Sequence, residues 1–163
     1  MGIYMQYGDI VGDATQAGFE RWINLAGFGW PNCIDRKGMR TETGRSRNRE
    51  PGQPVMGVIT VSKAFDHATG LLLKALCTVP QAKTCKIAFV RTDEGGDCYL
   101  QYTLTDALLA NLDLKGRESD RPDETWTIDF TELEIEVKQL NEANESGPSF
   151  HYGFNSATGK SKL

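Results

Sequence analysis

Apolar side chains recur at every second position along most of this chain. Segments 55–61, 85–89 and 98–104 show the alternation most clearly. A period of two puts successive side chains on opposite faces of a β-strand, whereas an amphipathic helix needs a period near 3.6. The alternation therefore predicts a mainly β protein. Its 163 residues are about one domain's worth, so we expect a single domain over residues 1–163.

The apolar pattern changes phase within residues 125–140. The apolar positions are Trp126, Ile128 and Phe130, followed by Leu133, Ile135 and Val137. A β-bulge near Thr131 would produce this slip and bend one long strand around a curved sheet. With a hairpin turn at 93–97 and a closing strand at 150–154, we expect an antiparallel β-barrel of about eight strands. Residues 155–163 would follow as a flexible tail.

One stretch, residues 66–79, has helical instead of strand periodicity. Asp66 is suited to cap a helix N-terminus, and Pro80 ends the segment. The apolar positions at helical spacing are Ala68, Leu72, Ala75, Leu76 and Val79. We expect one α-helix packed at the side of the barrel, with this stripe covering an open end or side.

Residues 31–53 form a long segment almost without apolar periodicity. Loops longer than about 15 residues are uncommon in compact domains and are usually functional or disordered. The net charge is only −4, yet this loop concentrates positive charge. From Arg36 to Arg49 a single acid, Glu42, faces six cations: Arg36, Lys37, Arg40, Arg45, Arg47 and Arg49. Over residues 113–145 acids outnumber bases by eleven to four. We expect the six cations to contact a neighbouring copy or an acidic partner.

The cysteines and histidines predict neither a metal site nor a cofactor. Cys33, Cys77, Cys85 and Cys98 lack CxxC spacing and lie in apolar surroundings, so we expect four reduced thiols in the core. His67 and His151 have no Cys, Asp or Glu neighbour at the spacing that metal ligands need.

Three local patterns resemble chemical motifs, and each has a simpler explanation. Segment 153–161 resembles a phosphate-binding loop, but five residues separate its glycines where the motif has four, and no helix follows. The acids at 132, 134 and 136 fit the solvent face of a strand. Ser62 and Cys77 lack a nucleophile-elbow signature. We expect no enzyme, the alternative being a hydrolase whose site converges from distant strands.

Neither a membrane nor nucleic acid is an expected partner. The apolar runs are far shorter than the roughly 20 residues that span a bilayer. The N-terminal segment lacks the basic and apolar regions of a Sec signal, which predicts a cytoplasmic protein or one that leaves by another route. The arginine-rich loop lacks interleaved aromatic residues, and the sequence pI is about 5.2.

Four segments occur in an order and at a spacing that resemble a known family. They are Trp22 to Trp30, Ile59 to Lys63 leading into Asp66 to Thr69, Asp120 to Glu124, and the ending Gly153 to Asn155. Their succession across nearly the whole chain resembles the Hcp family, the tube-forming proteins of bacterial type VI secretion systems. None of the segments is a chemical signature by itself.

The resemblance implies a β-barrel with one helix at its side, assembled as a hexameric ring that stacks into a tube inside a contractile sheath. Such proteins leave the bacterial cytoplasm through the machine they build, topped by a spike protein, and can hold effector proteins in the ring lumen. The six basic residues of the 31–53 loop would then contact the next ring. If an acidic surface lies on the opposite face, the contact would propagate head to tail.

The alternative from another class is a binding module that uses the same basic loop on an acidic partner or nucleic acid. The molecular mass in solution separates the two interpretations, because only the tube protein must form a ring of identical subunits.

Overall fold

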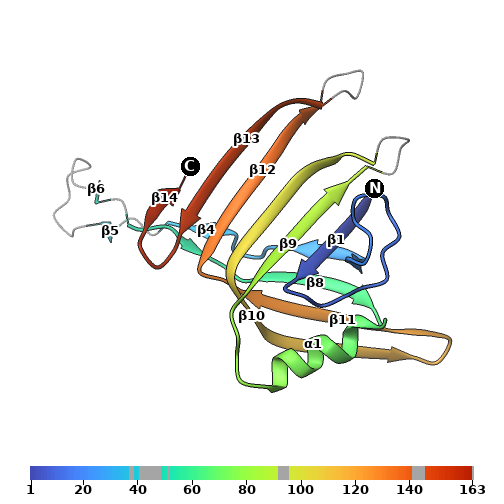
Figure 1. Ribbon diagram of the computed structural model, residues 1–163. Helices are drawn as coiled ribbons and strands as arrows, with labels where there is room; N and C mark the ends of the chain where they lie inside the picture. The colour runs from blue at the N-terminus through green and yellow to red at the C-terminus, as the bar shows by residue number, and fades with distance from the viewer. Residues whose placement is uncertain (37–38, 41–48, 51, 92–95, 141–145, 163) are drawn as a thin grey trace.

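The computed structural model describes residues 1–36, 39–40, 49–50, 52–91, 96–140 and 146–162. These ranges contain one helix, α1 (Ala68–Cys77), and are otherwise dominated by β-strands (Figure 1). The strands are β1 (Gly2–Tyr7), β2 (Ile23–Leu25), β3 (Gly27–Gly29), β4 (Ile34–Asp35), β5 (Met39–Arg40), β6 (Arg49–Glu50), β7 (Val55–Met56), β8 (Ile59–Ala64), β9 (Lys83–Val90), β10 (Cys98–Arg117), β11 (Asp120–Asp129), β12 (Glu132–Leu140), β13 (Ser146–Asn155) and β14 (Lys160–Lys162). The expected antiparallel, mainly β class with one helix is confirmed.

Two groups of strands share β10 and wrap around one core. The first half of β10 pairs with β9 and β12, and its second half pairs with β11. The change of partner occurs where the register shifts between Leu104 and Ala107, around Asp106 with its φ of 54°. On the other side, the chain passes from β2 to β3 at Ala26, whose N–H donates to the Ser62 carbonyl oxygen at 2.7 Å. The strands therefore do not close into a continuous hydrogen-bonded barrel as expected; the chain itself links the two groups at Ala26.

The phase slip near Thr131 marks a change of sheet, which corrects the expected bulge in one long strand. β11 ends at Asp129 and pairs with β8 and β10, whereas β12 begins at Glu132 and pairs with β10 and β13. Trp126, Ile128 and Phe130 are buried in the main core, as expected.

Helix α1 lies beside β10 and packs its stripe on the barrel core. Ala68 and Leu72 are fully buried, but Val79 is exposed, which corrects its place in the stripe. His67 occupies the N-cap position, and the Asp66 carboxylate accepts the N–H of Ala68 at 2.9 Å. Asp66 therefore supplies the capping acceptor from one position earlier than expected.

The cysteines are free thiols, but only one lies fully in the core. Cys85 is buried, and this burial raises the pKa of its thiol. Cys98 is half-buried, whereas Cys33 and Cys77 are exposed, contrary to expectation.

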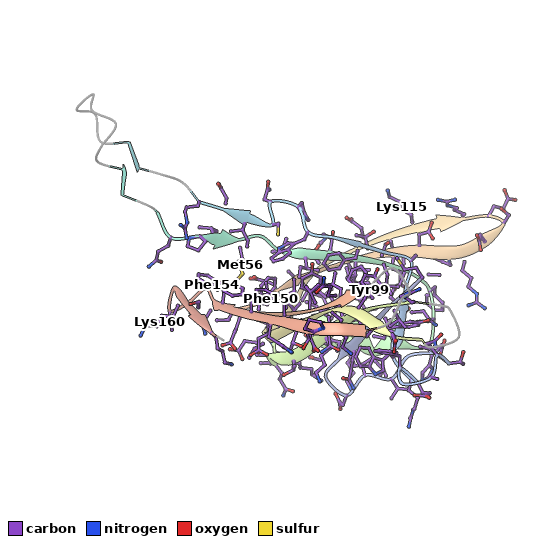
Figure 2. The ribbon with its side chains drawn as sticks, turned by 90° about the horizontal axis from the view of Figure 1, so that it is seen from above. Met56, Tyr99, Lys115, Phe150, Phe154 and Lys160 are labelled. Atoms are coloured by element: carbon purple, nitrogen blue, oxygen red, sulfur yellow. The ribbon has the colours of Figure 1, made fainter. Side chains whose placement is uncertain are left out.

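Two segments expected to lack structure contain short strands. The segment 31–53 contains β4, β5 and β6; β5 pairs with β6, and β4 pairs with β7 just after the segment, so the described part is a β-ribbon. At the end of the chain, β14 pairs with β13, which corrects the expected flexible tail for residues 160–162. Side chains and ribbon are shown together in Figure 2, where β4 and β7 extend away from the barrel.

Candidate assembly surfaces

The basic ribbon, defined as residues 31–53, brings two of the six predicted contact residues together. Arg40 and Arg49 are directly opposite each other in the β5–β6 ladder. Arg36 follows β4 and is exposed. Lys37, Arg45 and Arg47 lie outside the described residues.

The β10–β11 hairpin projects from the opposite end of the molecule, as Figures 1 and 2 both show. Residues 113–123 carry four acids and three bases. Arg117 pairs with Asp123 at 3.2 Å, and both side chains are more than half exposed. The hairpin is therefore charged at its surface but nearly balanced.

The acids of the last third do not form one surface. Glu132 and Glu134 pair with Lys162 at 2.6 and 3.2 Å, and Asn155 donates to Glu132 at 3.1 Å. Hydrogen bonds from Lys162 and Asn155 lower the pKa of Glu132, and those with Glu132 and Glu134 raise the pKa of Lys162. Glu124, by contrast, is fully buried.

Segments that carried the family resemblance meet in a buried charge cluster that sequence reasoning missed. The Lys63 ammonium donates to Thr69 Oγ1 at 3.0 Å and lies 3.1 Å from Glu124 and 2.8 Å from Asp66. Trp126 Nε1 donates to the same Glu124 oxygen at 2.9 Å. Lys63 and Glu124 are fully buried. The cluster ties β8, β11 and the start of α1 together. The sequence analysis sought core positions among apolar residues alone, and therefore did not find this lysine and glutamate.

One arrangement on β12 and β13 superficially resembles a catalytic triad. Ser149 Oγ lies 3.1 Å and Glu136 Oε1 3.8 Å from His151 Nε2. A triad histidine uses one ring nitrogen for the nucleophile and the other for the acid. Because both groups approach the same nitrogen, the arrangement cannot relay a proton between them.

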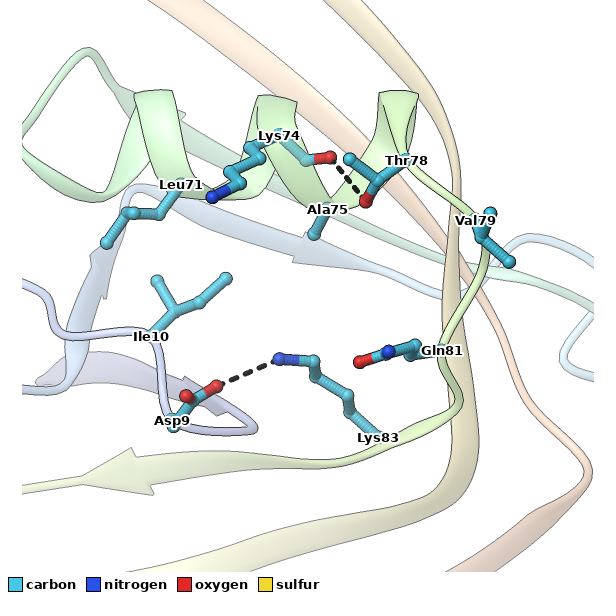
Figure 3. A pocket seen from close by; sticks show the side chains of 9 residues that line it. All are labelled: Asp9, Ile10, Leu71, Lys74, Ala75, Thr78, Val79, Gln81 and Lys83. Carbon is cyan, nitrogen blue, oxygen red and sulfur yellow. Dashed lines mark hydrogen bonds and ion pairs between the residues drawn. The ribbon is translucent and has the colours of Figure 1, made fainter.

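A cleft between α1 and the β1–β9 side of the barrel is shown in Figure 3. Lys83 bridges to Asp9 at 2.8 Å and lowers the pKa of that carboxyl group. Thr78 Oγ1 donates to the Lys74 carbonyl oxygen at 2.9 Å. The lining contains no histidine or cysteine and a single carboxylate.

Within the described ranges, no group of three or more His, Cys, Asp or Glu side chains could hold a metal ion. The one helix of the described ranges, α1, is too short to cross a bilayer.

Comparison with known proteins gives a consistent result. The family profile described as "Type VI secretion system effector, Hcp" matches residues 4–137. A solved type six secretion system protein has a TM-score of 0.86 at 22% identity, over 99% of both chains. Hcp1 from Salmonella typhimurium has a TM-score of 0.77 at 16% identity, over 99% of this chain and 98% of its own. The cap that terminates the anti-feeding prophage tube has a TM-score of 0.58 at 15% identity, over 83% and 87%. No curated protein sequence gives a significant match.

Proposed function

The chain belongs to the Hcp family of type VI secretion system proteins, and we propose that it forms a hexameric ring that stacks into the inner tube of such a machine. Membership makes it a tube component. In the proposed assembly, the tube lies inside a contractile sheath, carries a spike protein at its tip and holds effector proteins in the lumen. The protein then leaves the bacterial cytoplasm through the machine and needs no Sec signal.

The observation that carries this proposal is the match over 134 of the first 137 residues together with a fold shared over the whole chain. A binding module using only a basic loop would not need this barrel, helix and strand order. A structural role also accords with the histidine geometry at Ser149 and Glu136, which offers no proton relay.

We assign ring stacking to the basic ribbon. It projects from one end of the molecule, and the β10–β11 hairpin projects from the other (Figures 1 and 2). Contacts between such different ends are heterologous, and a heterologous contact whose rotation does not close propagates along an axis. Interactions between exposed charges are screened by salt beyond a Debye length of about 8 Å at physiological ionic strength. We therefore expect the stacking of rings through the basic ribbon to weaken as the salt concentration rises.

Replacing Arg45, Arg47 and Arg49 together by Glu tests this assignment. We expect the ring mass from light scattering to stay the same, while tubes seen by electron microscopy and secretion into the medium are lost. Raising the salt concentration should separate stacked wild-type rings before it dissociates any ring.

In the control, Arg21, Lys86 and Lys160, three cations outside the ribbon, are replaced together by Glu, and this variant should keep tubes and secretion intact. A monomeric arginine variant would place the ribbon in the ring interface. Normal tubes and normal secretion by that variant would refute a stacking role for these charges.

A further inference from the structure

Strands β12 and β13 extend the first group of strands beyond the barrel, and we call them the wing. Their ladders place three apolar rows across β10, β12 and β13. The rows are Leu104, Leu133 and Phe154, then Tyr102, Ile135 and Tyr152, and finally Leu100, Val137 and Phe150. Because side chains two positions apart share a face, all three rows lie on one face of the sheet.

This apolar face is covered at one end and bare at the other. In the first row, Leu133 is 5% and Phe154 9% exposed. In the second row, Tyr152 is 40% exposed. In the third row, Val137 reaches 36% and Phe150 reaches 62%. The apolar pattern of a core face therefore continues past the point where the described residues cover it.

Such a surface favours a protein partner. Contiguous exposed apolar patches on soluble proteins mark interaction sites, since burying them gains roughly 25 cal/mol per Å². Among the described strands, β13 pairs with β14 only at residues 153–155, so its outer edge beside Phe150 has no strand partner. An open edge next to an apolar face is also a place where another chain can add.

A second copy of this chain fits that surface. A different apolar set is exposed on and next to α1: Phe65, Leu71, Leu73 and Val79. In Figure 1, α1 lies at the opposite side of the molecule from the ends of β12 and β13. One chain thus carries two separate uncovered apolar surfaces, which is what a heterologous contact that closes into a ring requires.

We propose that the apolar face of the wing, around Val137, Phe150 and Tyr152, packs on the neighbouring subunit and closes the ring. This inference rests on the proposed function and adds the surface that makes the ring. The opposite face of the wing carries the polar side chains Glu134, Glu136 and His151, and Glu134 already pairs with Lys162 at 3.2 Å, so we expect this face to stay in water.

The test compares two adjacent positions on β13. Phe150→Asp puts a charge on the apolar face, and Ser149→Asp puts the same charge on the opposite face, across from Lys138. Both sites are exposed, so both variants should keep the wild-type circular dichroism spectrum. We expect Phe150→Asp to have the mass of a monomer in light scattering and Ser149→Asp to have the wild-type ring mass.

A photocrosslinking amino acid at position 150 gives a second measurement that does not depend on a disruptive variant. We expect it to form crosslinks between subunits, mapped by mass spectrometry to a segment other than β13. A Phe150→Asp ring of wild-type mass, or crosslinks within one chain only, would overturn the wing assignment. A monomeric wild-type protein would instead refute the proposed function itself.

Discussion

The Lys63 ammonium is a fully buried cation with two carboxylates, Asp66 and Glu124, within about 3.1 Å. One Glu124 oxygen accepts from both Lys63 and Trp126, and its other oxygen has no hydrogen-bond partner among the described residues. Buried charges are tolerated only when they are paired, because desolvation costs several kcal/mol per ion. The stability of the β8–β11–α1 junction therefore depends on Lys63.

We predict that Lys63→Met lowers the free energy of unfolding by about 3–5 kcal/mol, because it leaves the buried Glu124 carboxylate and the partly exposed Asp66 carboxylate without a cation. Urea unfolding at equal protein concentration measures the loss. Lys86→Met, which removes a partly exposed lysine from β9, should change stability by no more than about 0.5 kcal/mol. Equal stabilities for the two variants would contradict this role for Lys63.

Residues differ in how well the sequence predicts them. Alternation correctly predicts that Trp126, Ile128 and Phe130 are buried, because a half-buried strand must alternate. It does not find Lys63 and Glu124, since their burial depends on partners 61 positions apart along the chain. The exposure of Cys33 and Cys77 was missed for a related reason: an apolar neighbourhood in sequence does not fix which element covers a side chain.

At the scale of elements, strand type was more predictable than strand partners. The hairpin of β9 and β10 follows from two alternating segments and a glycine-rich turn. The change of direction near Thr131 was predicted from the phase slip in the apolar pattern. A bulge within one strand and a change of sheet produce the same slip, so only the observed strand pairing distinguishes the two. The end of β10, residues 113–117, is exposed on both faces and hence shows no strong alternation. Strand β14 is also fully exposed and shows no alternation, and Lys162 on this strand forms ion pairs with Glu132 and Glu134.

Lys162 holds β14 to β12, and we predict that Lys162→Met lowers the hydrogen-exchange protection of the amides in residues 153–155 and 160–162. Lys160→Met is the matched control, because Lys160 lies on the same strand and forms no ion pair with a described residue. Equal protection in the two variants would show that backbone pairing alone holds β14.

The ion pair between Lys162 and Glu132 stabilises β14 only within a limited pH range. The pKa of Glu132 is lowered, so its contribution is complete above the unfolded value near 4.3 and is lost as the pH falls through the lower folded pKa. The pKa of Lys162 is raised, so its contribution is complete below about 10.4 and is lost as the pH rises through the higher folded pKa. Protection factors at β14 should therefore decrease at both extremes in wild type and be flatter in Lys162→Met.

For the whole molecule, the distribution of uncovered surfaces accounts for assembly in two directions. The apolar wing and the apolar residues at α1 lie on opposite sides and suit ring closure, whereas the basic ribbon and the β10–β11 hairpin lie at opposite ends and suit stacking. The division makes physical sense. Burial of apolar surface tolerates salt, but exposed charge contacts do not.

The most direct test of this account is the mass of the purified full-length protein, measured by size-exclusion chromatography with light scattering at tens of micromolar in mild salt. The account predicts a closed ring of six times the 18.1 kDa subunit mass, with a central hole visible by electron microscopy. A single species of 18.1 kDa under these conditions would contradict it.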